Sequence, residues 1–266
     1  MTAVVLECYG ARVRLSAPSA AVESVLEEIA PFATPAAQRT ADVSLDAVAA
    51  AGDTWVVRSD SVHVDDHDAF GPRHLVAVLV DRLHALFSEY ARGVHFVHAG
   101  AFRLGQSLVI VPGRSGAGKS SLVAEALRHG AVYYSDDFAV IDPDGMVHPY
   151  PRRLGLRRPS GARNHLSASA LGAEVATEPA GVDLVLSTSF VSAGTVWSPE
   201  PVTGSRAALP IIDNTVRARL DPPGVAHMAA AVARRATTLV GDRGEAHELI
   251  AALRNRSAPI PDAASN

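Results

Sequence analysis

One segment of the chain has the residue types and spacing of a phosphate-binding loop. Residues 113–120 read Gly-Arg-Ser-Gly-Ala-Gly-Lys-Ser, a match to the pattern G-x-x-x-x-G-K-[ST]. Its glycines let the backbone curl so that successive N–H groups point at phosphate oxygens, Lys119 supplies a cation, and the Ser120 hydroxyl can bind Mg²⁺. The sequence therefore predicts a nucleotide site with ATP and Mg²⁺ as cofactors. The residues expected to bind the nucleotide are Gly113, Ser115, Gly116, Ala117, Gly118, Lys119, Ser120 and Ser121.

The segments on either side of this loop support the interpretation. Residues 107–111 form a short apolar run typical of a strand, and apolar residues after the loop recur at helical spacing up to Gly130. The N-terminus of that helix would face the phosphates and add its partial positive charge.

Two adjacent carboxylates, Asp136 and Asp137, close the next predicted strand. Transfer of a γ-phosphoryl group to a hydroxyl needs Mg²⁺ held by a carboxylate and an acceptor that orients the attacking O–H. Adjacent residues of a strand point to opposite sides, so the pair can divide these tasks. We expect Asp136 to act on the hydroxyl and Asp137 to support Mg²⁺ together with Ser120. The alternative is an acidic pair that only caps a turn.

Together these residues resemble the catalytic domain of HPr serine kinase/phosphorylase and its smaller bacterial relatives, which include kinases of ribosomally made peptides. Family members carry a histidine ahead of the loop, then the loop, a helix and a strand that closes in Asp-Asp. Here His98 stands 15 residues before Gly113, and Asp136 stands 17 residues after Lys119. The resemblance implies that Asp136 acts on an acceptor serine and that His98 lies close to it. It is clearest over residues 94–147.

The chain departs from the bifunctional enzymes after the Asp pair. Residues 153–156 read Arg-Leu-Gly-Leu where those enzymes carry an Arg-Gly-Leu-Gly-Ile-type signature, and no glutamate lies between Asp144 and Arg163. The resemblance therefore gives no basis for expecting the phosphorylase activity or HPr as the substrate.

A segment rich in arginine and proline runs from Pro149 to about Arg163 and is expected to be a loop. A guanidinium pairs well with phosphate oxygens, so one or two arginines could stabilise the transferred group, and others could receive an acidic substrate segment. Arg152 and Arg157 are the candidates, because they lie where the chain looks like the smaller relatives. A solvated loop is the alternative for any single arginine.

Composition excludes several classes of function. The 266 residues are 48% hydrophobic with a net charge of −4, which gives no reason to expect a nucleic-acid or anionic-membrane binder. The single Cys8 cannot form an internal disulfide. Residues 1–15 lack a secretory signal pattern, and the apolar run 75–80 is too short to span a bilayer. We expect a cytoplasmic protein, and a homo-oligomer remains open.

The expected fold class is α/β, with a small N-terminal mixed domain (1–92), a P-loop domain of the HPr-kinase type (93–256) and a frayed tail (257–266). The expected strands of the first domain are Ala3–Cys8, Arg12–Ser16, Ala41–Leu45, Thr54–Arg58 and Ser61–Val64, and its helices are Pro18–Ala30 and His74–Tyr90. In the second domain, we expect a helix within Ile211–Arg219 after Pro210, and a chain break at 222–224 before a helix over Val225–Arg235.

These observations predict Mg²⁺-dependent transfer of the ATP γ-phosphoryl group to a serine of a peptide or small protein. One alternative is a kinase of a small molecule, for instance free serine or a sugar. Another is a nucleotide-sensing module that has no acceptor and binds a partner when ATP is present. The sensing module would bind ATP without forming a phosphorylated product.

Overall fold

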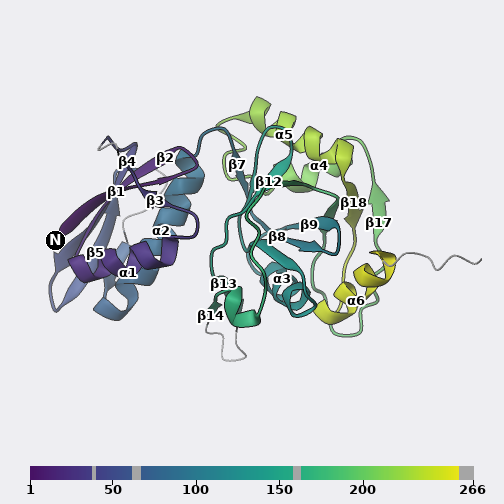
Figure 1. The fold of residues 1–266 in the computed structure, drawn as a ribbon, viewed down its shortest axis with the longest axis horizontal. Coiled ribbons are helices and arrows are strands. Elements are labelled where there is room, and N and C mark those ends of the chain that lie inside the picture. Colours follow the sequence, from purple (N-terminus) through teal and green to yellow (C-terminus); the bar gives the residue numbers. More distant parts are fainter. Residues whose placement is uncertain (38–39, 62–66, 158–162, 258–266) are drawn as a thin grey trace, which may run out of the picture. The chain divides into compact units, whose positions relative to one another are not determined.

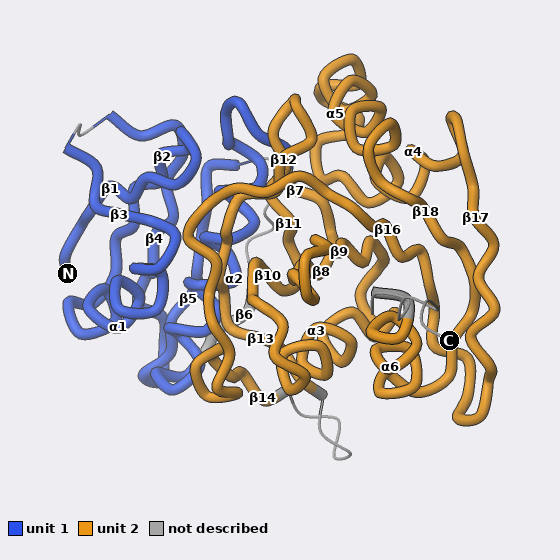
Figure 2. The backbone as a smooth tube through the Cα atoms, turned by 45° about the vertical axis from the view of Figure 1, so that its right-hand side comes forward, with its two compact units in different colours: residues 1–95 blue, residues 96–266 orange. Residues whose placement is uncertain are grey.

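The computed structural model describes residues 1–37, 40–61, 67–157 and 163–257. The chain forms two compact units, residues 1–95 (unit 1) and 96–266 (unit 2), as Figure 2 shows. From the sequence we placed this division after residue 92.

Unit 1 is a mixed sheet with two helices packed against it. The sheet has the strand order β3-β1-β2-β4-β5-β6, and both α1 and α2 contact β2. Every second residue of β2 is buried, which is the pattern of a strand with one covered face. The elements are β1 (Thr2–Cys8), β2 (Ala11–Ala17), α1 (Ser19–Ile29), β3 (Thr34–Pro35), β4 (Val43–Ala50), β5 (Thr54–Ser59), β6 (His67–Phe70) and α2 (Pro72–Tyr90).

Most elements expected in this unit are confirmed, with shifts at their ends. The strand expected from Ala41 begins at Val43 and continues to Ala50. The helix expected from His74 begins at Pro72, because proline has no N–H to leave unpaired in a first turn. The strand expected over Ser61–Val64 falls mostly outside the described residues.

Unit 2 has a six-stranded central sheet with the order β10-β8-β9-β16-β18-β17 and a smaller sheet with the order β15-β12-β11-β7. Figure 1 shows these elements in teal, green and yellow. They are β7 (His95–Val97), β8 (Ala99–Leu104), β9 (Ser107–Pro112), α3 (Lys119–Arg128), β10 (Val132–Ser135), β11 (Ala139–Ile141), β12 (Met146–His148), β13 (Leu154–Arg157), β14 (Arg163–Leu166), the short helix η1 (Ser169–Leu171), β15 (Ala180–Gly181), β16 (Leu184–Ser187), β17 (Glu200–Val202), α4 (Ser205–Ile212), α5 (Pro222–Arg235), β18 (Thr237–Val240) and α6 (Ala246–Ser257).

The direction of the strands brings the two sequence motifs to one edge of the central sheet. Strands β9, β16 and β18 are parallel. Strand β10 is antiparallel to β8, which is antiparallel to β9, so β10 runs in the direction of β9. The phosphate loop after β9 and the Asp pair after β10 therefore leave the sheet at the same edge, where parallel strands of α/β proteins form ligand sites.

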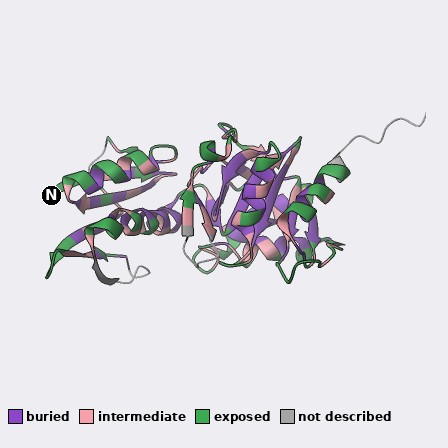
Figure 3. Cartoon of the chain, turned by 90° about the horizontal axis from the view of Figure 1, so that it is seen from below, coloured by how far each residue is buried: buried purple, intermediate pink, exposed green. Residues whose placement is uncertain are grey.

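Both faces of the central sheet are covered. Helices α3 and α6 pack on one face, where Leu122, Leu249 and Leu253 belong to one apolar cluster. On the other face, Ile110 and Val185 join a second cluster with Met228 of α5. Figure 3 shows the buried residues along the strands between these layers. Burial on both faces explains why β9 reads as a continuous apolar run instead of an alternating one.

Three expectations for unit 2 are wrong in detail. The segment 149–163 is not a loop throughout, because β13 and β14 pair as an antiparallel hairpin. The helix expected after Pro210 lies earlier, as α4, and includes Pro210. Residues 222–224 do not break the chain but form the first turn of α5, where the Asp221 carboxylate accepts a hydrogen bond from the Gly224 N–H.

Within the described parts of the chain, no helix is both long enough and apolar enough to span a membrane.

Candidate functional site

The phosphate loop connects the buried end of β9 to the start of α3. Gly116 and Gly118 have φ angles of 93° and 83°, in the left-handed region that favours glycine. The N-cap position of α3 is Gly118, which offers no side chain to the first turn of the helix. The free N–H groups of that turn are therefore available to a bound anion, which is the arrangement that the motif predicted.

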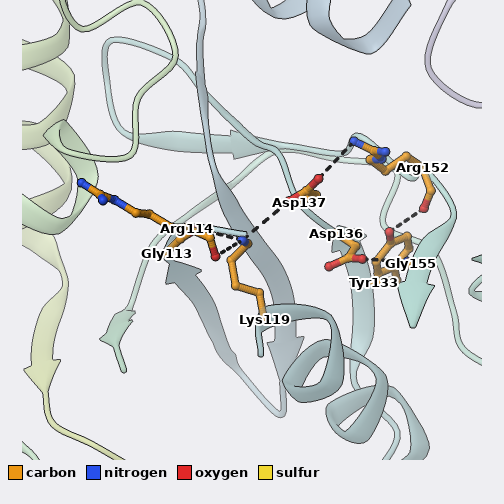
Figure 4. A network of polar contacts seen from close by, with 8 residues as sticks. All are labelled: Gly113, Arg114, Lys119, Tyr133, Asp136, Asp137, Arg152 and Gly155. Atoms are coloured by element: carbon orange, nitrogen blue, oxygen red, sulfur yellow. Dashed lines mark hydrogen bonds and ion pairs between the residues drawn. The ribbon is translucent and has the colours of Figure 1, made fainter. Parts of the chain in front are cut away.

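Lys119 is buried and holds its ammonium group inside the loop. The Nζ atom donates to the Gly113 carbonyl at 2.7 Å and to the Arg114 carbonyl at 3.1 Å, and it lies 3.6 Å from Asp137 Oδ1. Figure 4 shows the side chain rising between the loop and the Asp pair. The ammonium thus lies where the motif needs a cation for the β- and γ-phosphates.

Asp136 is almost fully buried, with 1% of its surface exposed. Its Oδ2 accepts a hydrogen bond from the Gly155 N–H at 3.1 Å, whereas Oδ1 has no hydrogen-bond partner among the described residues. Burial raises the pKa of this carboxyl group above its ordinary value, although hydrogen bonds from the Ser120 side chain and the Gly155 N–H pull the pKa down. A buried carboxylate with an unpaired oxygen beside Ser120 can serve as a ligand of a cation.

Asp137 differs from its neighbour in conformation and in exposure. Its φ angle of 72° lies in the left-handed region, which is strained for a residue other than glycine. The side chain is 38% exposed and lies between two cations, with Oδ1 3.6 Å from Lys119 and Oδ2 3.6 Å from Arg152. In Figure 4, Asp136 turns toward Gly155, whereas Asp137 turns toward the cations.

Arg152 is the arginine of the hairpin region that reaches the Asp pair. Its carbonyl accepts a hydrogen bond of 2.6 Å from the buried Tyr133 hydroxyl, and its guanidinium lies 5.6 Å from the centre of the Phe138 ring. These contacts fix the backbone and the head of the side chain. Arg157, the other arginine expected at the site, ends β13, and its side chain lies outside the described part of the structure.

His98, which the resemblance placed close to Asp136, lies beside the next two residues, Asp137 and Phe138. Its ring lies 4.7 Å from that of Phe138, centre to centre. The pKa of His98 is lowered, first because the surrounding protein atoms disfavour the charged ring and also because Lys119 is near, while Asp137 acts in the opposite direction. The neutral imidazole is therefore favoured beside the Asp pair.

A cleft of about 330 Å³ joins the phosphate loop, the Asp pair and Arg152, whereas His98 is not among the residues that line it. Gly113 and Ala117, which we expected to contact the nucleotide, do not line this cleft but a second cavity of about 880 Å³. The cleft also has walls that the motifs did not predict. Its lining includes the loop residues Ser115, Gly116, Gly118, Lys119, Ser120 and Ser121, together with Asp136, Asp137, Arg152, Gly155, His165, Phe190, Arg243 and Glu245.

The donor groups fit Mg²⁺ bound together with a nucleotide. Within the described residues, no three His, Cys, Asp or Glu side chains gather to hold a metal ion by themselves. Mg²⁺ usually takes one or two protein carboxylates and completes its shell with water and substrate phosphates. Ser120 and the unpaired Oδ1 of Asp136 supply this kind of partial site. The sequence had paired Ser120 with Asp137 instead.

Phe190 and Arg243 are the main residues that the sequence analysis missed. Both follow parallel strands, β16 and β18, at the edge that carries the phosphate loop. That position was the available signal, but it requires knowledge of the order of strands in the sheet.

Comparison of the sequence with models of protein families and with curated proteins gives no match. Among solved structures, the chain is similar to the Hpr(Ser) kinase/phosphatase from Coxiella burnetii. The identity is 14%, the match covers 61% of this chain and 95% of that chain, and the TM-score is 0.31. Because this likeness is so distant, the function is inferred from the geometry of the residues described above.

Proposed function

We propose that this protein is a kinase that transfers the γ-phosphoryl group of ATP to a hydroxyl, with a serine of a peptide or small protein as the acceptor. The observation that carries the proposal is the position of Asp137. Its carboxylate lies 3.6 Å from both Lys119 of the phosphate loop and Arg152. A proton acceptor beside two cations at the end of a phosphate-binding loop is the arrangement that phosphoryl transfer needs.

The division of labour within the Asp pair follows from exposure. Asp136 is buried against Ser120 and Gly155, so an acceptor hydroxyl cannot reach it without displacing them. Asp137 is exposed to the cleft. We therefore assign Asp136 and Ser120 to Mg²⁺ and its water shell, and Asp137 to the acceptor hydroxyl. This is the reverse of the roles expected from the sequence.

In the proposed reaction, the hydroxyl oxygen attacks the γ-phosphorus, and the bond between that phosphorus and the β,γ-bridging oxygen breaks. The hydroxyl proton passes to the Asp137 carboxylate, and ADP leaves. Lys119 and Arg152 hold and neutralise the oxygens of the transferred group. Bound Mg²⁺ would neutralise charge on the β- and γ-phosphates. His98, kept neutral by its surroundings, orients the Asp137 segment from the Phe138 side.

The rim of the cleft supports an acidic peptide as the acceptor. Arg153, an exposed residue next to Arg152, lines the cleft and adds positive charge where a substrate would enter. The resemblance to peptide kinases noted in the sequence agrees with this choice.

The test is transfer of label from [γ-³²P]ATP with Mg²⁺ to serine-containing acidic peptides, free serine and simple sugars. We expect phosphoserine in a peptide. Asp137→Asn should lower kcat by about 10²-fold or more at saturating Mg²⁺, because it removes the proton acceptor. Asp136→Asn should instead raise the Mg²⁺ concentration needed for half-maximal rate. Asp144→Asn is the matched control, because Asp144 lies in the exposed turn between β11 and β12.

The outcomes separate the alternatives. Labelled free serine or sugar without labelled peptide would identify a small-molecule kinase. ATP binding without any labelled product would support a nucleotide-sensing module. Equal transfer by the wild type and Asp137→Asn would overturn the assigned role, and failure to bind ATP would overturn the proposal as a whole.

A further inference from the structure

Phe190 and Arg243 form a part of the cleft wall that comes from other strands than the Asp pair does. Beyond the ends of β16 and β18, the Arg243 N–H donates to the Ser189 carbonyl at 3.0 Å, and the Val191 N–H donates to the Arg243 carbonyl at 3.1 Å. These bonds continue the parallel pairing of the two strands. Phe190 and Arg243 are therefore fixed side by side on a rigid extension of the sheet.

Arg243 is a buried cation that is bound to the phosphate loop. It is 2% exposed, and burial lowers its pKa. One guanidinium nitrogen donates to the Gly118 carbonyl at 3.2 Å and another to the Gly244 carbonyl at 2.8 Å, whereas Nε has no partner among the described residues. None of the described carboxylates forms an ion pair with it, although Glu245 is near enough to raise its pKa. Burial of an uncompensated charge is costly, so this arginine is not explained by stability.

Phe190 is a large apolar side chain left open to the cleft. It is 45% exposed and lines the cleft beside Gly118. The Arg243 guanidinium lies 5.7 Å from the centre of its ring and backs it from inside the protein. A phenylalanine ring held in place at the wall of a polar cleft is a stacking surface for a planar group.

The order of strands places this surface at the correct end of a nucleotide. The Asp pair follows β10, on one side of β9, and Phe190 and Arg243 follow β16 and β18, on the other side. A triphosphate with its γ-phosphate at Asp137 and its β-phosphate in the loop would direct its nucleoside toward β16 and β18. We infer that Phe190 stacks on the nucleobase of the bound nucleotide and that Arg243 is the residue that positions it. This inference rests on the proposed binding of a nucleotide in the cleft.

The test compares two probes, ATP and inorganic tripolyphosphate, each titrated with Mg²⁺ into the full chain by calorimetry. Phe190→Ala should weaken ATP binding by about 10-fold, the typical loss of one base-stacking contact, and should leave tripolyphosphate binding unchanged. Phe190→Tyr should keep the affinity for ATP. Val191→Ala, the exposed neighbour that does not line the cleft, is the matched control and should change neither probe.

Arg243 is tested by the ratio of the two affinities. Arg243→Lys retains the charge but loses the planar group behind the ring, so the preference for ATP over tripolyphosphate should fall as in Phe190→Ala. If Phe190→Ala binds ATP as tightly as the wild type, or weakens both probes equally, the stacking surface is disproved. An unchanged ratio in Arg243→Lys disproves its positioning role. If the wild type binds neither probe, the proposed nucleotide site itself fails.

Discussion

The two units of the chain place their charged side chains in different ways. In unit 1, the arginine side chains of the described ion pairs are exposed, as in the pair of Arg92 with Asp42. In unit 2, Lys119, Asp136 and Arg243 are all buried around one cleft. Burial of a charge is expensive, whereas an exposed pair costs and contributes little. The contrast indicates that the buried charges at the cleft lower the stability of unit 2, whereas the ion pairs of unit 1 have little effect on its stability.

The largest effect should come from the cation of the phosphate loop. Lys119→Met retains much of the buried stem and removes the charge, so we expect the rate of phosphoryl transfer to fall by about 10³-fold, typical of the loss of one preorganised cation. Phosphate transfer and ATP affinity are measured together. Arg128→Met is the control, because Arg128 lies at the other end of α3 and pairs with Glu125 at the surface. If both variants lost phosphoryl transfer equally, the loss would come from any substitution in α3 and not from removal of the charge at the cleft.

The second effect concerns the packing of Arg243 against the loop. A Cβ atom on Gly118 would collide with the Arg243 guanidinium, whereas a Cβ atom on Gly116 would meet nothing within 4 Å. Both glycines have positive φ angles, so backbone strain is common to the two alanine variants. Gly118→Ala should therefore reduce the free energy of unfolding by about 1–3 kcal/mol more than Gly116→Ala does.

That difference is measured by urea unfolding in a Trp55→Phe background. The chain has two tryptophans, and Trp197 then reports on unit 2 because it packs against the α3–α6 side of the core. Similar losses in the two alanine variants would show that Arg243 moves aside easily. Such a result would weaken the view that Arg243 is fixed.

The third effect is a gain in stability. Burial raises the pKa of Asp136, so the folded state holds its proton more tightly than the unfolded state does. The free energy of unfolding therefore falls as the pH rises from about 3.8, the ordinary pKa, to the raised pKa of the folded state. It stays lower at higher pH. Asp136→Asn removes the charge, so it should be more stable than the wild type at pH 7.5. The advantage should be smaller at pH 4.5.

Asp142 provides a control of opposite sign. Burial raises its pKa, but hydrogen bonds from His148 and the Met146 N–H outweigh burial and hold the pKa below its ordinary value. Its ionised form therefore stabilises the fold above that value, and the contribution is lost as the pH falls through the folded pKa. Asp142→Asn should lose stability at pH 7.5. Urea unfolding of both variants at pH 4.5 and pH 7.5 decides whether the buried charge of Asp136 lowers the free energy of unfolding.

The sequence predicted the parts of the site that depend on local patterns. The strand, loop and helix around Lys119 follow one another directly, and Asp136 comes just after the next strand, so the local pattern predicts each motif, while the common direction of β9 and β10 brings them to one edge. Arg243 was missed because its neighbours Gly118 and Phe190 are brought to it only by the parallel pairing of β9, β16 and β18, which links distant segments.

The errors in helix boundaries also have physical causes. Prolines were taken as breaks, yet Pro222 begins α5, where its missing N–H costs nothing. Pro210 lies inside α4, a helix of eight residues in which tertiary packing of Ala208 and Ile211 outweighs one lost backbone bond. The roles within the Asp pair could not be predicted from the sequence either. They depend on which carboxylate is buried, and Asp136 is buried against Ser120 and Gly155, which the fold brings to it.

The smallest effect is expected in unit 1. Arg92 Nη2 contacts Asp42 Oδ1 at 2.6 Å, but the arginine side chain is 59% exposed, so solvent screens the pair. Arg92→Ala keeps the Cβ atom that lies near Gly10, and it should lower the free energy of unfolding by only about 0.2–1 kcal/mol. Urea unfolding in a Trp197→Phe background, with Trp55 on β5 as the reporter, isolates this unit. The effect should shrink in 1 M salt, as it does for a screened surface pair. A loss of several kcal/mol that salt does not change would mean that unit 1 also depends on a desolvated charge, and the contrast between the two units would not hold.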